Sequence, residues 1–329
     1  MTGNLHCLPV PTPYPVGPVN LYLIPGDEPA LIDTGPATDE AWAVLNAGLA
    51  AHGLCVGDLR TVVVTHAHLD HYGLAGRIVA ESGARLFTHP YNEPLLTDFH
   101  GEWERMKQFY GQVFIKAGVP LQKLMAMGKH VQRGESFASE PVATIHLIND
   151  GDRLDINGEH WDVLHTPGHA LGAVCLHNRE TQRLITGDHL LPEVNSNPVI
   201  EPPPRARTER PRCLVDYLAS LERVAQLDVK TAYPGHGEPI TAHRALIARR
   251  IAHRRRRTDQ VRALLNDAGQ TVYELAQQVF VQEIPPGQLF LMVSEVLGHL
   301  DILEMCGECA VSEAGGVWRY RRQPRKEVA

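Results

Sequence analysis

The first part of the chain alternates short apolar runs with longer segments whose apolar residues recur at helical spacing. The β-branched and aliphatic runs at 19–24, 30–35 and 61–66 predict buried strands. Residues 37–51 carry apolar positions every three or four residues, which predicts a helix with Thr38 as its N-cap. A helix at 73–82 and a strand at 84–89 continue this order. The pattern indicates an α/β unit in which polar groups follow the ends of strands.

The middle of the chain predicts more strands, interrupted by a helical insertion at about 92–134. Short apolar runs predict strands at 142–148, 153–156, 160–166, 172–178 and 183–188. A Pro-rich loop and a helix at 213–227 follow. Many short strands flanked by helices indicate a two-sheet α/β sandwich covered on both faces.

The pattern changes near residue 240. An arginine-rich helix at 242–266 is followed by two further helical segments, and the chain then reads as a strand, a Gly-Gly turn and a second strand. Three helices followed by a hairpin are the order of a winged-helix module. We therefore expect a first domain over 1–245 and a helical, winged-helix-like domain over 246–329.

Composition restricts the class of protein. Of 329 residues, 43% are hydrophobic and 21% are charged, as in an ordinary globular chain. No apolar run reaches the length of about 18 residues that a membrane span needs, and the first residues do not resemble a secretory signal. The six cysteines are too scattered for a disulfide framework, which predicts a cytoplasmic setting. The net charge of −7 argues against a dedicated nucleic-acid binder.

The chain has 18 histidines, and their placement carries the functional argument. His66, His68, Asp70 and His71 occupy one short loop as H-A-H-L-D-H, directly after a predicted strand. Neutral imidazoles and a carboxylate suit Zn²⁺, and also iron or manganese. Because His66 and His68 alternate while the following turn redirects Asp70 and His71, one loop can supply two adjacent metal sites.

Three later fragments are candidates for the remaining ligands. They are TPGH with His169, TGDH with Asp188 and PGHG with His236, and each follows a predicted strand and contains glycine. Glycine permits the tight turns that present such side chains. An aspartate can bridge two cations because it has two oxygens.

With H-x-H-x-D-H followed by these three fragments, residues 15–240 resemble the metallo-β-lactamase-fold hydrolase superfamily. The resemblance implies an αββα sandwich and two divalent metal ions, zinc first and iron or manganese as alternatives. It implies a first metal held by His66, His68 and His169, a second held by Asp70, His71 and His236, and Asp188 as the bridge. It further implies that Asp70 accepts a proton during catalysis and that Asp33 supports the ligands from behind.

The resemblance also narrows the activity. An aspartate at position 188 is similar to glyoxalase II-type thioesterases, lactonases and nucleases, and unlike true β-lactamases. The flavodiiron branch has glutamate where His68 stands, so it is disfavoured. The C-terminal elements are similar to those of the β-lactamase-like protein 2 subgroup. The implied mechanism is attack by a water whose pKa two cations lower from 15.7 towards roughly 7.

We expect a small acyl substrate, a thioester before a lactone or another ester, because an apolar face of the insertion suits an acyl chain. A single-stranded RNA or DNA endonuclease is the alternative, for which the arginines of the 242–266 helix would supply polyanion binding. A solvated, ion-paired helix face or a homodimer contact is the default explanation of those arginines. The insertion equally suits a dimer surface or a separate small core. A metal-stabilised binding protein is the non-catalytic alternative.

Other polar residues have open interpretations. His189 suits either a substrate contact or a packed position, and Tyr217 suits either a reach into the site or a place in the core. Three histidines in strand-like runs are interpreted as structural: His89, His146 and His165. Cys306 and Cys309 form a C-x-x-C pair without a second pair, so we interpret them as incidental thiols.

Overall fold

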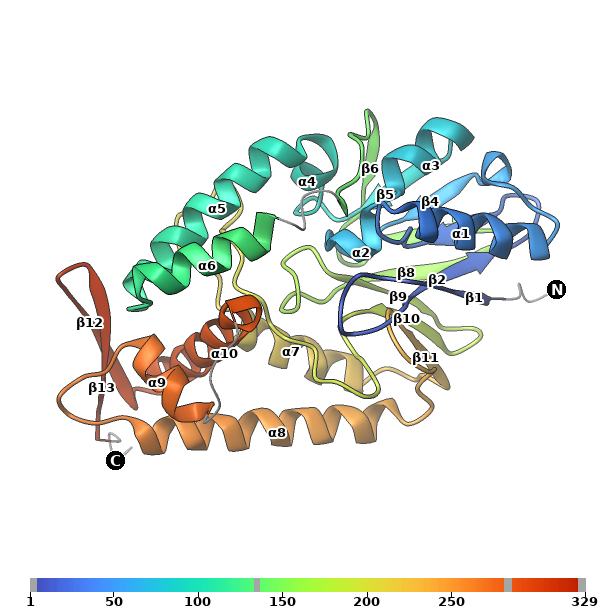
Figure 1. The fold of residues 1–329 in the computed structure, drawn as a ribbon. Coiled ribbons are helices and arrows are strands. Elements are labelled where there is room, and N and C mark those ends of the chain that lie inside the picture. The colour runs from blue at the N-terminus through green and yellow to red at the C-terminus, as the bar shows by residue number, and fades with distance from the viewer. Residues whose placement is uncertain (1–4, 133–136, 281–285, 325–329) are drawn as a thin grey trace.

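The computed structural model describes residues 5–132, 137–280 and 286–324, and in them the apolar runs form two sheets that lie face to face (Figure 1). All six residues of β2 (Val19–Ile24) are buried. Alternation along this strand sends Leu21 and Leu23 to the helix-covered face and Tyr22 and Ile24 to the face that meets the other sheet. Helices on the outer faces complete the αββα sandwich that the sequence predicts.

The first sheet combines an antiparallel edge with a parallel centre. Its strands lie in chain order: β1 (His6–Val10), β2, β3 (Ala30–Ile32), β4 (Thr61–Val63), β5 (Arg85–Thr88) and β6 (Ile145–Leu147). β3 to β6 pair in parallel, with Ile32 beside Val63 and Val63 beside Phe87. Its outer face is covered by α1 (Asp39–Ala51), η1 (Val56–Asp58), α2 (Leu69–Tyr72) and α3 (Ala75–Ser82).

The second sheet has the order β11-β10-β9-β8-β7. Its strands are β7 (Arg153–Ile156), β8 (Glu159–His165), β9 (Val174–Asn178), β10 (Arg183–Gly187) and β11 (Thr231–Pro234). Only the β10–β11 pair is parallel among them. Leu214, Tyr217 and Leu221 of α7 (Cys213–Ala225) pack in the apolar cluster that covers its outer face.

The helical insertion and the C-terminal helices share one apolar core. The insertion forms α4 (Glu93–Thr97), α5 (Phe99–Lys116) and α6 (Leu121–Gln132). The C-terminal part forms α8 (His243–Leu264), α9 (Val272–Val279), α10 (Pro286–Met305) and the hairpin of β12 (Cys309–Ala314) and β13 (Val317–Arg322). Phe114 of α5 packs in the same cluster as Val261 of α8 and Leu297 of α10. The elements follow the predicted order, but the insertion packs against the chain's C-terminal end.

The structure refines several boundaries. Thr38 does cap α1, since its hydroxyl accepts the backbone N–H of Ala41 at 3.1 Å. β4 ends at Val63 instead of residue 66, because the chain leaves the sheet before the first histidine of the motif. The predicted helix at 73–82 is preceded by the short α2, so Asp70 and His71 lie on a helical turn. None of the helices seen in the described residues combines the length and apolarity needed to cross a bilayer.

Candidate metal centre

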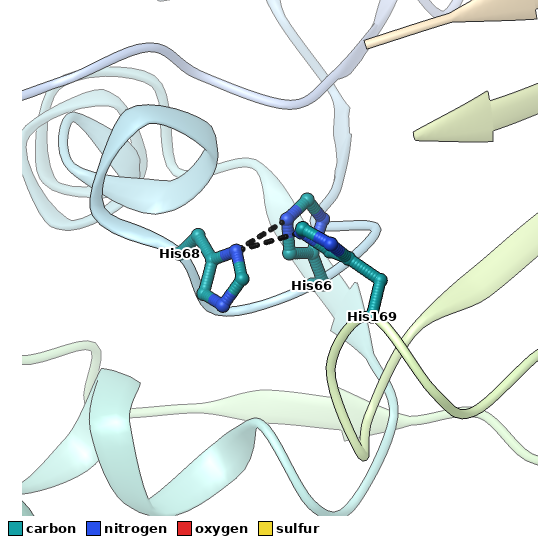
Figure 2. A group of neighbouring side chains, drawn as sticks. All are labelled: His66, His68 and His169. Carbon is teal, nitrogen blue, oxygen red and sulfur yellow. Dashed lines mark hydrogen bonds between the residues drawn. The ribbon is translucent and has the colours of Figure 1, made fainter. Parts of the chain in front are cut away.

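Three histidines from two loops converge beyond the end of the first sheet (Figure 2). His66 and His68 lie on the loop between β4 and α2, and His169 lies on the loop between β8 and β9. Nδ1 of His68 lies 3.1 Å from Nε2 of His66 and 2.9 Å from Nε2 of His169. Three imidazole nitrogens thus face one point and could hold one cation.

A second group lies beside the first. Asp70, His71 and His236 offer ligand atoms that all lie within 4.8 Å of one another, and all three residues are buried. Nε2 of His236 lies 3.4 Å from Oδ2 of Asp70. These three side chains could hold a second cation.

Asp188 lies between the two groups. Its Oδ1 is 3.3 Å from Nε2 of His71, and its Oδ2 is 3.6 Å from Nε2 of His169 and 3.7 Å from Nε2 of His236. One carboxylate therefore faces both groups, as a bridging ligand would. The structure brings together all seven residues that the motif and the three fragments single out.

The outward nitrogens of these rings have fixed partners. Nδ1 of His236 donates to the carbonyl of Pro18 at 2.7 Å, and Nδ1 of His169 donates to the carbonyl of Asn197 at 3.0 Å. A carbonyl only accepts, so each ring carries its proton on Nδ1 and presents the lone pair of Nε2 to the centre. The hydroxyl of Ser196 also lies 3.0 Å from Nδ1 of His169.

Asp33 connects the two groups from behind. Its Oδ2 lies 2.8 Å from Nδ1 of His71 and accepts the hydroxyl of Thr65 at 2.8 Å, and that hydroxyl lies 3.1 Å from Nδ1 of His66. Its Oδ1 accepts the backbone N–H of Thr65. Asp33 adopts φ of 60°, an uncommon value for a residue with a side chain. Asp33 therefore lies behind the ligand histidines, as the resemblance implies. Thr65 links Asp33 to His66, a contact that the sequence does not reveal.

Several buried atoms of the centre lack a hydrogen-bond partner within the described chain. They are Nε2 of His71, Nε2 of His236 and Oδ1 of Asp188. Leaving such atoms unpaired in the interior costs free energy, and a cation would satisfy all three. The donor set of imidazole nitrogens and carboxylates suits zinc, iron or manganese. The residues therefore fit a divalent metal.

Burial and charge separate the histidines into two kinds. Burial, reinforced by His169, lowers the pKa of His68 to about 3, and burial also lowers the pKa of His66 and of His169. Burial opposes protonation of His71 too, but Asp188 and Asp33 raise its pKa well above the ordinary value. Burial thus favours neutral imidazoles in the first group, whereas the nearby carboxylates raise the pKa of His71 and of His236, so a cation would compete there with a proton.

Close backbone approach holds Asp188 against the loop after β11. A Cβ at Gly235 would lie 2.3 Å from Oδ1 of Asp188 and 2.7 Å from Cε1 of His71. Any larger residue at Gly235 would displace one of these ligands. The glycine of PGHG therefore has a steric reason, beyond turn formation, to stand there.

Two cavities open onto the centre. One, of about 510 Å³, reaches Asp70 and Asp188 and is bounded by side chains of α4, α5 and α6, including Leu95, Met106 and Leu124. The other, of about 1160 Å³, lies between the loop after β10 and α10. The insertion thus covers the centre. It also belongs to the apolar core of the C-terminal helices, so its apolar residues serve both a cavity wall and a core.

Arginines of α8 hold the loop that orients His169. Arg254 is buried, donates to the carbonyl of Ser196 at 2.8 Å and lies 3.3 Å from a carboxylate oxygen of Glu295. Arg250 donates to both carbonyls of residues 191–192. This face of the helix is therefore packed, not solvated, which its composition did not reveal.

The other residues singled out in the sequence lie outside the two ligand groups. Tyr217 is buried and donates to the carbonyl of His189, and the two rings are 5.5 Å apart. His89 stacks on His165 with ring centres 4.0 Å apart. All six cysteines are free, and Cys306 is exposed whereas Cys309 is buried. His146 is exposed on β6.

Comparison with known proteins agrees with this geometry. The family model described as "Metallo-beta-lactamase superfamily" matches residues 14–236. The "Probable metallo-hydrolase YqjP" of Bacillus subtilis is 38% identical over 304 residues, covering 92% of this chain and 93% of that protein. A metallo-beta-lactamase family protein from Thermus thermophilus superposes with a TM-score of 0.81 at 32% identity, covering 97% and 98% of the two chains. The "Acyl-coenzyme A thioesterase MBLAC2" of Gallus gallus is 30% identical over 116 residues, which cover 34% of this chain and 38% of that protein.

Proposed function

Because the chain belongs to the metallo-β-lactamase superfamily and is a metal-dependent hydrolase, we propose that it hydrolyses thioesters with an apolar acyl group. The observation that carries the substrate class is the 510 Å³ cavity, whose lining is mainly aromatic and aliphatic and which ends at Asp70 and Asp188. Such a cavity favours an acyl chain over a sugar phosphate. The partial likeness to an acyl-coenzyme A thioesterase supports the same choice.

In this proposal two divalent cations, zinc first, are held by the seven residues described above. His66, His68 and His169 would hold the first, Asp70, His71 and His236 would hold the second, and Asp188 faces both groups. When bound, the cations would lower the pKa of a water and polarise the substrate carbonyl. Asp70 lines the cavity, and its carboxylate would accept the proton that the attacking water gives up. Asp33 and the carbonyls of Pro18 and Asn197 keep the rings oriented throughout.

Thiol release from glutathione and coenzyme A thioesters of increasing acyl length tests the proposal. Zinc- or manganese-loaded protein should turn over at about 1 s⁻¹ or faster with apolar acyl groups. His68→Ala should abolish turnover, and His146→Ala, an exposed histidine on β6, should retain it. Metal-replete protein that releases no thiol from any member would contradict the proposal, and lactones would be the next substrates.

The nuclease alternative rests on exposed arginines of α8. Arg249, Arg255 and Arg256 face solvent, whereas Arg250 and Arg254 are turned into the protein. If the exposed set binds single-stranded RNA, affinity should fall steeply with salt, and replacing the three by alanine should flatten that dependence. Cleavage of labelled RNA by metal-loaded protein, with no thiol release, would favour this alternative.

The division into domains at 245/246 also stays a prediction. α8 begins at His243, and its buried face contacts both the loop after β10 and the C-terminal core. We propose that the C-terminal elements act as a wall of the substrate site. Limited proteolysis near residue 245, followed by metal and activity assays on the separated parts, would test whether they work apart.

A further inference from the structure

Aromatic side chains gather in the 510 Å³ cavity. The chain has 20 aromatic residues, 7 Phe, 4 Trp and 9 Tyr, and six of them line this one space. They are Tyr14, Tyr72, Phe99, Trp103, Tyr110 and Phe290. They come from the loop between β1 and β2 and from α2, α5 and α10, so distant parts of the chain contribute to one aromatic enclosure. An acyl chain alone needs apolar walls, but it does not need aromatic ones.

A carboxyl group lies within this enclosure. Glu201 lines the aromatic cavity and also an adjoining space of about 170 Å³, next to Leu95 and Met106. Its Oε2 accepts the backbone N–H of Leu171 at 2.6 Å. Among the described residues it forms no ion pair, and burial raises the pKa of its carboxyl to about 7. A polar group placed in this way is typical of the few that orient a ligand in an apolar pocket.

The neighbouring glutamate shows the contrast. Glu102 on α5 is buried and is paired with Arg105 and with Arg205, whose Nη2 lies 3.4 Å away. The two arginines are thus directed at Glu102. Lys107, which also lines the aromatic cavity, forms an ion pair with Glu104. In the described part of the chain, two arginines pair with Glu102, whereas the Glu201 carboxylate accepts the backbone N–H of Leu171.

We propose that the cavity recognises an organic cation: an alkylammonium or trimethylammonium group carried on the acyl part of the substrate. The cation would lie between aromatic faces, which attract positive charge, and the Glu201 carboxylate would pair with it. A ligand cation would supply the counter-charge that no ion pair among the described residues gives Glu201. The assignment of the acyl part rests on the proposed thioesterase function, whereas cation binding does not.

Direct binding tests the cation site without catalysis. Calorimetric titration of the full chain at pH 8 should show 1-hexylammonium and hexyltrimethylammonium binding about tenfold more tightly than 1-hexanol. Glu201→Gln should remove this preference, because glutamine can still accept the N–H of Leu171 but carries no charge. Glu81→Gln removes an exposed carboxylate of α3 that does not line the cavity, and it should leave the preference intact. Equal affinity for cation and alcohol, or a preference that survives Glu201→Gln, would overturn the inference.

Turnover then separates this inference from the proposed function. The matched substrates are hexanoyl and 6-(trimethylammonio)hexanoyl thioesters of coenzyme A, which differ only at the chain end. We expect kcat/KM to be about tenfold higher for the cationic substrate, through KM, and the difference to vanish in Glu201→Gln. Hydrolysis of both at equal efficiency would refute the cation site while leaving the thioesterase in place. Hydrolysis of neither would refute the thioesterase, and the binding titration would still decide the cation site.

Discussion

The metal centre and the cavity beside it are built in opposite ways. Four of the seven candidate ligands lie within six residues, at the end of a parallel strand, and the others follow strands of the second sheet. The cavity wall instead collects side chains between Tyr14 and Phe290 from loops and helices. Metal binding demands particular atoms in fixed positions, whereas an apolar wall demands only size and burial. A short motif can therefore encode the first but not the second.

The largest expected effect is loss of the residue shared by both ligand groups. Asp188→Ala should lower turnover about 10³-fold or more and reduce bound metal, because both groups lose a negatively charged neighbour. Metal content by mass spectrometry and thiol release measure it. Activity near the wild-type level in metal-depleted Asp188→Ala protein would exclude the proposed centre.

A methyl group at Gly235 should disturb the same carboxylate without removing it. Gly235→Ala places a Cβ 2.3 Å from Oδ1 of Asp188, and we expect about a 100-fold loss in kcat with the fold retained. Gly57→Ala is the matched control, since its Cβ would meet only Sγ of Cys55 at an ordinary 3.7 Å. Circular dichroism confirms folding. Unchanged kcat in Gly235→Ala would show that Asp188 moves without consequence.

Arg254 connects the C-terminal helices to the metal centre. Its replacement tests whether a residue outside the short motif also affects metal binding. Arg254→Met should weaken metal affinity about 10-fold to 100-fold through the loop that holds His169. It should also lower the free energy of unfolding by about 2 kcal/mol, because the carbonyl of Ser196 and Glu295 lose a buried donor, while Glu295 keeps Arg257 at 2.9 Å. Arg256→Met, at an exposed position on α8, is the control for both measurements. If affinity stays constant while stability falls, Arg254 supports the fold alone.

The smallest effect concerns the C-terminal core, far from metal chemistry. Burial lowers the pKa of His299 to about 3, and its Nδ1 lies 2.8 Å from the hydroxyl of Thr258. The folded state favours the neutral ring of His299. The contribution of this ring to the free energy of unfolding is therefore complete above the unfolded pKa of about 6.5, and it declines as the pH falls towards 3. Between pH 7 and 5.5 the wild type should lose about 1 kcal/mol more unfolding free energy than His299→Asn. Urea titrations at both values measure this difference, and parallel losses in the two proteins would contradict it.

The sequence predicts the sandwich and the seven clustered residues because both leave periodic or local patterns. The β-branched run before His66 and the glycines beside His169, Asp188 and His236 are local signals. Nothing local marks Arg254 as different from its exposed neighbours in the RRRR run at 254–257, because only the packing of α8 decides which side is buried. No local pattern in the Pro-rich loop marks Glu201 as a residue of the cavity either. Its surroundings come from Leu171 and from helices about 90 to 110 residues earlier.

The carbonyls that orient two of the ligand histidines have a consequence for variation. His236 and His169 donate to main-chain oxygens of residues 18 and 197, and every amino acid supplies such an oxygen. Positions 18 and 197 can therefore drift in identity while the tautomers of both rings stay fixed, provided that the backbone path is kept. Libraries that randomise Asn197 should yield many metal-competent clones, and libraries that randomise Asp33, whose carboxylate does the equivalent work for His71, should yield few. A position that orients a ligand histidine through its backbone thus tolerates substitution, whereas a position that does so through its side chain does not.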